Sequence, residues 1–417
     1  MALKSIPKTT DGKGRRRCHS WIDQFVEWTA NLEAAPLFRK WSAITAIAAV
    51  LEQKVWVKTT TLFYPNLYTV LVGNPGIGKS RSITAVTKFV RDLNDIALGA
   101  TSMTMASLVD ILEESKKSYV NNIGAIPTEY NSLFISVDEL SAFMHEYSKE
   151  LVAGLTAFYD TNPYFQARRG RDIRAVIPRP QLNILTGTTP ANLLNLIPAN
   201  AWSQGLTSRI ILIYSKDHPL VDVFNVEYPD EPEDLIHDFK LINKLHGEFG
   251  WTKAYAKAMN DWRVSGMGPM PTHPRLESYN ARRYSHLIKL TMISSVDRSD
   301  SLILEEEDCK RAINWLLEAE GVMEVIFETT ENSKDAQALE EILYYIKGHA
   351  AHGVPESSVI GYAAKRLNYA AHASAAVGVL IASRKVLATQ VSESGLRWLV
   401  ATEFISSAPS KSPSSKQ

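Results

Sequence analysis

The 417-residue sequence predicts an α/β fold with additional helical parts, and three observations support this class. Apolar runs at residues 67–73, 133–137, 182–187 and 209–215 alternate with helical stretches, as expected for the strands and helices of a largely parallel sheet. A glycine-rich loop follows the first of these runs directly. Residues 217–335 then have a mostly helical apolar pattern.

Six segments organise the chain. We expect a disordered basic tail at residues 1–19, a helical element at 20–53, the sheet-bearing core at 54–216, a helical lid at 217–335, a small domain at 336–405 and a disordered low-complexity tail at 406–417. The core and the lid are the parts that are long enough to bury a sizeable interior.

The small domain has the order helix, turn, helix, helix and hairpin, which is typical of a winged helix. The hairpin is predicted to turn at residues 392–395. The third helix is rich in alanine, and its basic residues, Arg384 and Lys385, come only at its end. Because a base-reading helix needs polar side chains along it, docking of a partner protein or ring assembly is at least as well supported as DNA reading.

The bulk composition excludes several classes of protein. Lys plus Arg and Asp plus Glu both number 45, so any contact with nucleic acid must come from local basic patches. Cys18 and Cys309 lack the spacing of a metal or disulfide framework. No apolar run reaches the ~18–20 residues of a membrane span, and none follows the basic residues 14–17. We therefore expect a cytoplasmic protein without a membrane partner.

The loop at residues 73–80 reads GNPGIGKS and fits the phosphate-loop pattern G-x-x-x-x-G-K-[ST]. A predicted strand leads in and a predicted helix leads out, so backbone N–H groups and the helix dipole would face phosphate oxygens. Lys79 would supply charge to the β- and γ-phosphates, and the Ser80 hydroxyl would hold Mg²⁺. The predicted contacts of the nucleotide are Gly73, Asn74, Pro75, Gly76, Ile77, Gly78, Lys79, Ser80 and Arg81. The alternative is a glycine-rich turn with a coincidental lysine.

An acidic pair follows the second apolar run, in the sequence LFISVDEL. Asp138, at the end of a buried strand, is predicted to be the second anchor of Mg²⁺. Glu139 is predicted to polarise the attacking water as a general base. The two residues alone are weak evidence, and the preceding phosphate loop strengthens them.

The third and fourth apolar runs supply further candidate catalytic residues. The strand at residues 182–187 leads to Thr188 and Thr189, and its tip is expected to lie between the two phosphate-binding elements. Either threonine would there orient the water or sense the γ-phosphate. Arg209 begins the next strand after the sequence GLTS. An arginine at this place is a candidate arginine finger for a neighbouring subunit, although a surface arginine is the simpler alternative.

In this order, GNPGIGKS, FISVDE, the threonine-ended strand and GLTSR resemble the AAA+ ATPases. The lead-in WSAITAIAAVLEQKVWV, followed by YPNLYTVLVGNPGIGKS, also resembles a family of phage, plasmid and mobile-element ATPases that are described as primase-helicase-like or replicative-helicase-like. The resemblance covers about residues 37–330. It implies ATP contact by residues 73–80, Mg²⁺ and hydrolysis roles for Asp138 and Glu139, and a role in trans for Arg209. The primase or zinc-binding module of such proteins is missing here, so primer synthesis is not expected.

A helical lid of this kind is expected to carry one further arginine that contacts ATP. Arg283 is the predicted cofactor-binding residue, with Arg282 and Lys289 as further candidates on the same predicted helix. The alternative, exposed arginines that pair with Glu277 or with solvent, is about equally supported.

A basic segment lies between the acidic pair and the threonine-ended strand, where YFQARRGRDIRAVIPRPQ predicts a β-hairpin around Gly170. Arg168, Arg169, Arg171 and Arg174 are the predicted DNA-binding residues, and Arg179 follows them. In AAA+ hexameric helicases a hairpin at this point projects into the pore of the ring, where arginines would contact phosphates without reading sequence. The alternatives are a solvated surface hairpin or a face that contacts another subunit.

The leading hypothesis is therefore a Mg²⁺-dependent, ring-forming ATPase that translocates on DNA, most directly a replicative DNA helicase of a phage or mobile element. A head-to-tail interface completed by Arg209 would close into a homo-oligomer, expected to be a hexamer with single-stranded DNA in its pore. A replication protein is the expected partner of the winged helix. The alternatives are a helicase loader or remodelling ATPase, and a nucleotide-switched module that binds DNA or protein. A RecA-like core is the alternative fold, which would lack the helical lid.

Overall fold

The computed structural model describes residues 16–120, 127–144, 147–167, 174–221, 232–349, 353–367, 370–390 and 397–402. Contacts divide the chain into two compact units, Met1–Ile326 and Phe327–Gln417. The division falls inside helix α13 (Val325–Lys347), before the predicted boundary at residue 335. The N-terminal helices, the sheet and the predicted lid all belong to the first unit, so the lid is not a separate body.

The first unit is built around a five-stranded sheet with the order β4-β5-β8-β3-β9. The four strands predicted from the apolar runs are present and parallel, while β4 pairs antiparallel with β5. The strands are β3 (Tyr68–Val72), β4 (Lys116–Tyr119), β5 (Thr128–Val137), β8 (Pro180–Thr188) and β9 (Ile210–Tyr214). Every residue of β3, β8 and β9 is buried, which explains why apolar residues dominate their sequences.

The edge of the sheet contains one short parallel segment that the apolar pattern does not reveal. Leu98 forms an isolated parallel bridge with Phe134 of β5. The N–H of Gly99 donates to the carbonyl of Phe134 at 2.8 Å, and the N–H of Phe134 donates to Ala97 at 2.9 Å. The second half of β5 is therefore paired on both sides, although β4 covers only its first half.

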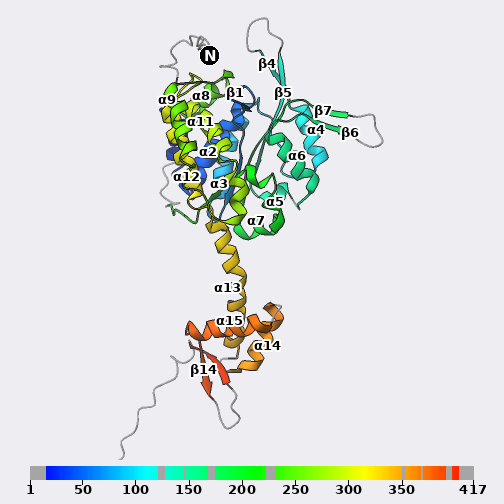
Figure 1. The fold of residues 1–417 in the computed structure, drawn as a ribbon, viewed down its shortest axis with the longest axis vertical. Helices are drawn as coiled ribbons and strands as arrows, with labels where there is room; N and C mark the ends of the chain where they lie inside the picture. Colours follow the sequence, from blue (N-terminus) through cyan, green and yellow to red (C-terminus); the bar gives the residue numbers. More distant parts are fainter. Residues whose placement is uncertain are drawn as a thin grey trace, which may run out of the picture. The chain divides into compact units, whose positions relative to one another are not determined.

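Helices cover both faces of the sheet (Figure 1). One face carries α2 (Pro36–Leu51) and α3 (Lys79–Asp92), and outside them lie α1 (Trp21–Trp28), α8 (Glu233–Asn243), α9 (Lys253–Val264) and α11 (Arg283–Arg298). Helix α12 (Glu306–Glu320) packs against α9, α11 and the edge strand β9. The opposite side carries α4 (Met105–Glu114), α5 (Leu140–Phe143), α6 (Lys149–Tyr159) and α7 (Pro190–Leu196). This arrangement leaves the carboxyl ends of β3, β5 and β8 at one edge, which is where ligands bind in open α/β sheets.

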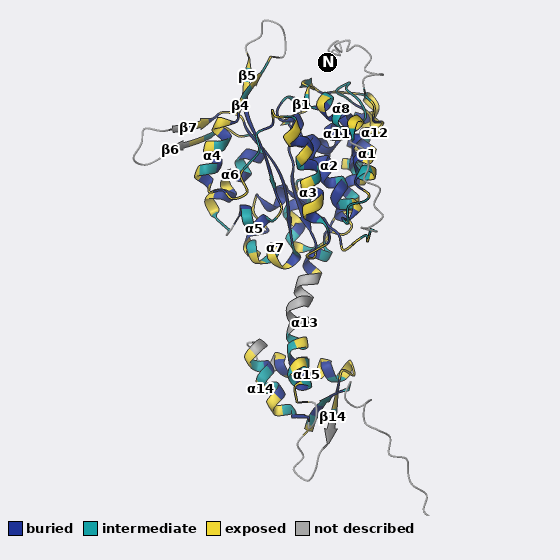
Figure 2. Ribbon diagram, turned by 180° about the vertical axis from the view of Figure 1, so that it is seen from behind, coloured by how far each residue is buried: buried dark blue, intermediate teal, exposed yellow. Residues whose placement is uncertain are grey.

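The two predicted N-terminal helices are present and form part of the core (Figure 2). Ser20 caps α1 by accepting the N–H of Asp23, and Trp21 stacks on Phe239 of α8 with ring centroids 4.7 Å apart. The Ser20 hydroxyl also donates to Asp297 of α11 at 2.8 Å. Helix α2 begins with Pro36, which suits the first turn because proline has no N–H to leave unpaired. These contacts join the N-terminal element to the helical block after the sheet.

The predicted disorder of residues 1–19 is wrong for its last part. Arg16 forms an ion pair with Asp300 at 2.7 Å, and Arg17 pairs with Asp234 at 3.1 Å. The carboxylate of Asp238 accepts the backbone N–H groups of Arg17 and Cys18. The acidic residues of α8 and of the turn after α11 therefore hold this segment in place. Residues 1–15 and the predicted tail at 406–417 lie outside the described residues.

The second unit contains the helices and the hairpin that the sequence predicts. Helices α14 (Glu356–Leu367) and α15 (Ala370–Ala382) follow α13, and a three-stranded antiparallel sheet has the order β13-β15-β14. Its strands are β13 (Val354–Pro355), β14 (Val386–Gln390) and β15 (Arg397–Ala401). Ile342, Val359, Val377 and Leu399 are buried together in its core. The predicted turn at residues 392–395 lies outside the described residues. Over the described part of the chain, no helix has both the length and the apolar character needed to cross a membrane.

Candidate functional site

The loop at residues 73–80 joins β3 to α3, as predicted, and its shape depends on glycine. Gly76 and Gly78 have φ values of +84° and +82°, which side chains of other residues rarely adopt. A Cβ atom on Gly78 would lie 2.1 Å from the carbonyl oxygen of Glu33, in the segment that leads to α2. Helix α3 starts at Lys79, so its first N–H groups face the space above the loop.

Lys79 is folded back over this loop. Its ammonium group donates to the carbonyl oxygens of Gly73 at 2.7 Å and Asn74 at 2.8 Å. Burial lowers the pKa of Lys79, and the nearby carboxylate of Glu139 acts in the opposite direction. The charge of Lys79 is therefore held where the loop curves, and it is near the acidic residue predicted to act as a base.

Other predicted contacts of the loop differ in accessibility. Asn74, Pro75, Gly76 and Ser80 are exposed, whereas Ile77 is buried. Arg81 is exposed too, but its guanidinium forms an ion pair with Glu33. This pair fixes the N-terminal segment against the loop. A nucleotide contact by Arg81 would have to compete with Glu33.

The acidic pair lies at the carboxyl end of β5, as predicted. Asp138 is exposed, and desolvation raises the pKa of its carboxyl. Gly187 of β8 allows a close approach here, because a Cβ atom on it would lie 2.8 Å from the carbonyl oxygen of Asp138 and 3.4 Å from Cβ of Lys79. Gly187 is not among the residues predicted from the sequence, although its place just before the two threonines marks it.

The two predicted threonines have different roles. The hydroxyl of Thr188 donates to Oε1 of Glu139 at 3.1 Å, so it contacts the predicted base directly. Thr189 is instead the N-cap of α7, where its hydroxyl accepts the N–H of Asn192 at 3.2 Å. In this arrangement the hydroxyl of Thr189 caps α7, and Thr188 is the threonine that contacts the predicted base.

Ser80 and Asp138 fit the predicted Mg²⁺ site in their chemistry. Mg²⁺ in nucleotide sites takes one or two protein oxygens and completes its shell with phosphates and water. The Ser80 side chain is exposed in the first turn of α3, next to the loop. The Asp138 side chain is exposed after β5, next to Gly187. Both are free to turn toward a bound phosphate.

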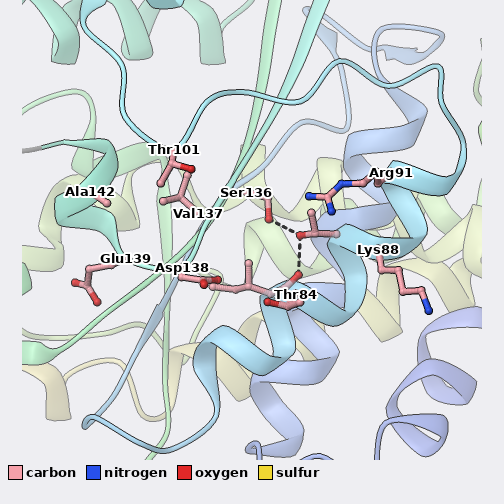
Figure 3. A pocket seen from close by; sticks show the side chains of 11 residues that line it. Thr84, Lys88, Arg91, Thr101, Ser136, Val137, Asp138, Glu139 and Ala142 are labelled. Carbon is pink, nitrogen blue, oxygen red and sulfur yellow. Dashed lines mark hydrogen bonds between the residues drawn. The ribbon is translucent and has the colours of Figure 1, made fainter.

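A cavity of about 480 Å³ opens beside the acidic pair (Figure 3). Helix α3 contributes Thr84, Lys88 and Arg91, and β5 with the residues after it contributes Ser136, Asp138 and Glu139. The cations and the carboxylates lie on different sides of this space in Figure 3. Lys88 and Arg91 are not among the residues predicted from the sequence, although their helical spacing from the phosphate loop marks them.

Arg209 does not present a free guanidinium. It is 5% exposed and forms an ion pair with Asp160, the residue after α6. Its Nη1 also donates to the carbonyl of Gly205, and Arg282 donates to the same Asp160 at 3.3 Å. The predicted role in a neighbouring subunit would require this buried pair to open. Asp160 was not identified from the sequence, and no local motif marks it.

Arg283 and Lys289 are corrected as candidate contacts of ATP. The Arg283 side chain is fully buried and forms a two-pronged ion pair with Glu320, with both donor–acceptor distances 2.7 Å. Its remaining donors bind the carbonyls of Met267 and Pro269. The ammonium of Lys289 donates to Asn66 in the interior. These buried cations are paired inside the first unit and stabilise the packing of α11, so neither is presented to a nucleotide.

The predicted hairpin is present as β6 (Tyr164–Ala167) and β7 (Arg174–Ile177), paired antiparallel. It projects from the sheet in Figure 1. Phe165 and Val176 form a cross-strand pair and are 70% and 47% exposed. The predicted DNA-binding residues Arg168, Arg169 and Arg171 lie outside the described residues, and Arg174 is the first residue of β7.

The fold and the site together define a mixed α/β protein with a glycine-rich loop and an acidic pair at one edge of its sheet. Comparisons with known proteins do not add a family: no protein-family model matches the chain, and no curated protein matches it either.

Proposed function

We propose that the chain is a Mg²⁺-dependent ATP hydrolase of the P-loop class with a core of the AAA+ type. One observation carries the proposal: three elements converge at the carboxyl edge of the sheet. Lys79 and its loop follow β3, and Glu139 follows β5. Thr188 ends β8, which lies between those two strands, and donates to Glu139. Hydrolysis requires this geometry, because the general base must lie beside the phosphates that the loop binds.

Each residue has a definite task in this reaction. Backbone N–H groups of the loop hold the phosphates, and Lys79 exchanges its carbonyl partners, Gly73 and Asn74, for phosphate oxygens. Ser80 and Asp138 hold Mg²⁺, which neutralises phosphate charge when it is bound. Glu139 takes a proton from the attacking water. The water oxygen bonds to the γ-phosphorus while the bond from that phosphorus to the bridging oxygen breaks, which gives ADP and phosphate.

The strand order supports the AAA+ type. The threonine-ended strand lies between the loop strand and the acidic strand, as the resemblance implies. Helices α8, α9, α11 and α12 supply the helical block that a RecA-like core would lack. The packing of this block against α1 and α2 differs from a free lid, and we therefore do not assign it a hinged motion.

We further propose that hydrolysis drives movement on DNA, as in a replicative helicase. The support is the projecting β6–β7 hairpin, whose last pair before the connecting residues is Ala167 with Arg174, and the arginine-rich sequence that joins its strands. Arginines on a projecting hairpin can bind phosphates without reading bases. Arg179, immediately before β8, is exposed and adds to this basic character.

A strand-separation assay on forked DNA tests the proposal, run beside the Lys79→Ala protein. The proposal predicts ATP-dependent unwinding that is lost in Lys79→Ala. A matched triple variant, Arg168→Ala with Arg169→Ala and Arg171→Ala, should hydrolyse ATP without DNA but bind single strands at least about tenfold more weakly, with a smaller salt dependence. DNA-stimulated hydrolysis without unwinding would indicate a loader or remodelling ATPase.

The ion pair between Arg209 and Asp160 favours a second candidate, a nucleotide-switched module that binds a partner. A buried Arg209 would have to leave Asp160 before it could complete a neighbour's site, and this favours a function that does not depend on ring closure. This candidate predicts ATP hydrolysis that DNA does not stimulate. The second unit would then be the partner-binding part, because the exposed face of α15 carries Ser374, Ala375 and Gly378, which suit protein packing better than base reading.

A further inference from the structure

The cavity beside the acidic pair extends along α3 and is not lined by the phosphate loop. Its lining on α3 runs from Ile83 to Arg91, whereas none of residues 73–80 lines it. Its volume of about 480 Å³ lies in the range of small-molecule sites, about 300–1,000 Å³. The space is therefore large enough for one nucleotide-sized ligand, and it reaches the phosphate-loop site only at Asp138 and Glu139.

Two cations at this cavity have no partner among the described residues. Lys88 and Arg91 are exposed, and neither forms an ion pair or a side-chain hydrogen bond within the described part of the chain. By contrast, Arg81 on the same helix is paired with Glu33. Lys88 and Arg91 are three residues apart on α3, and both line the cavity. In Figure 3 the guanidinium of Arg91 extends toward Ser136, while the flexible side chain of Lys88 extends in the other direction.

The remaining walls combine hydroxyl groups with apolar surface. Thr84 and Thr101 are exposed there, and the hydroxyls of Thr87 and Ser136 bond to each other across α3 and β5. Ile83 and Val137 supply apolar surface. Convergent polar groups on mostly apolar walls are the usual composition of a small-molecule site. A guanidinium beside an ammonium selects a phosphate, which accepts two-pronged hydrogen bonds.

We propose that this cavity is a second ligand site, which takes a phosphorylated nucleoside and holds its phosphate through Lys88 and Arg91. The ligand is either a free nucleotide or the phosphorylated end of a strand. Because Ser136 and Val137 line the cavity and directly precede Asp138, its occupant shifts the acidic pair and so changes the rate of hydrolysis. This last step rests on the proposed ATPase; binding itself does not.

The test is a titration of the full chain with N-methylanthraniloyl-ADP, measured for stoichiometry and affinity. The wild type should bind two equivalents of the probe per chain. This stoichiometry tests the second site in the unmodified protein. Lys79→Ala should retain one equivalent, and Lys88→Ala with Arg91→Ala should retain the other, after a loss of about a hundredfold or more in affinity at the cavity. Lys253→Ala with Lys257→Ala on α9 makes the same charge change outside the cavity and should leave both equivalents.

The possible failures are distinguishable. A single equivalent that is lost in Lys79→Ala and unaffected by the Lys88 and Arg91 changes would overturn the second site and leave the proposed ATPase standing. A single equivalent that is retained in Lys79→Ala and lost in Lys88→Ala with Arg91→Ala would support the ligand site in the cavity. It would contradict nucleotide binding by the phosphate loop. No binding at all would contradict both the second site and the proposed ATPase.

Competition identifies the ligand. Displacement of the cavity-bound probe by ADP alone assigns a free nucleotide. Displacement also by a 5′-phosphorylated tetrathymidylate, but not by its 5′-hydroxyl form, assigns a strand end. Failure of ADP to displace the probe would show that the fluorophore alone binds, which contradicts the proposal.

Discussion

The hydroxyl of Thr188 donates a hydrogen bond to Oε1 of Glu139 at 3.1 Å. This bond connects the carboxyl ends of the neighbouring strands β8 and β5, at the edge of the sheet where the phosphate loop leaves β3. A carboxylate that must take a proton from water needs a fixed orientation. Thr188 provides that orientation from β8, while Gly187, the residue before it, allows Lys79 and Asp138 to approach. The threonine is thus a positioning residue for the proposed base.

Replacing Thr188 should therefore impair turnover more than binding. Thr188→Val keeps the shape but removes the donor, and we expect kcat for ATP hydrolysis to fall about tenfold with KM changed less than about twofold. Thr188→Ser retains the hydroxyl and should stay within about threefold of the wild type. Steady-state kinetics of the three proteins give the answer. Equal losses in the valine and serine variants would contradict the hydrogen-bond explanation.

The matched control is the next residue. Thr189→Val removes the N-cap of α7 and should lower the free energy of unfolding by about 1 kcal/mol, with kcat largely retained. Urea unfolding and the same kinetic assay separate the two threonines. A loss of kcat in Thr189→Val as large as that in Thr188→Val would show that local packing, not the bond to Glu139, controls the rate.

The sequence predicted the parts of this site that are set by local pattern. Continuous apolar runs identified β3, β5, β8 and β9, and the glycine spacing identified a loop whose Gly76 and Gly78 have positive φ. The sequence did not separate Thr188 from Thr189, because which hydroxyl caps α7 and which faces Glu139 depends on the path of the chain after β8.

Predictions that depended on long-range contacts failed more often. Arg283 and Lys289 have a helical pattern compatible with an exposed face, yet Glu320 and Asn66, distant in sequence, bury them. Arg209 similarly depends on Asp160. No local signal places such partners. A buried ion pair is visible only when the fold brings its two halves together.

Arg283 is expected to stabilise the fold without affecting nucleotide affinity. Arg283→Met leaves the buried carboxylate of Glu320 without its partner and should cost about 3–5 kcal/mol in the free energy of unfolding. The double variant Arg283→Met with Glu320→Leu should recover most of this loss. KM for ATP, measured at a temperature where each variant is folded, should change less than about twofold. A large rise in KM in both proteins would restore the sequence-based assignment.

Arg209 can be tested for a role in trans by mixing subunits. Neither Lys79→Ala nor Arg209→Ala protein alone should hydrolyse ATP at the wild-type rate, the second because the Asp160 pair is lost. Since Arg209 is held within its own chain, an equimolar mixture should show only the average of the two separate rates. Recovery to about a quarter of the wild-type rate would instead show that each site receives Arg209 from a neighbour and would support the ring.

His286 should make stability depend on pH. Its Nε2 faces the carbonyl of Ser208 and therefore carries the proton, while Nδ1 accepts from the hydroxyl of Tyr159. Burial, together with the nearby cations of Lys289, Arg282 and Arg209, lowers its pKa from 6.5 to about 3. Between these values the unfolded chain binds a proton that the folded chain does not. Stability contributed by neutral His286 is thus complete above about pH 6.5 and falls by about 1.4 kcal/mol per pH unit on acidification.

Urea unfolding between pH 7 and pH 4 measures this contribution. His286→Gln should lose part of its stability at pH 7 but show a shallower decline toward pH 4 than the wild type. His246→Gln, at an exposed position, should keep the wild-type slope. Parallel slopes in all three proteins would contradict a buried neutral histidine.

The central claim is that Glu139 acts as the base on water beside a nucleotide held by the Lys79 loop, and Glu139→Gln tests it most directly. The measurement is single-turnover hydrolysis of ATP with Mg²⁺ by excess protein, paired with ATP affinity from equilibrium binding. The account predicts affinity within about threefold of the wild type and a hydrolysis rate lowered by about 10²–10⁴-fold. Hydrolysis by Glu139→Gln at the wild-type rate would contradict it.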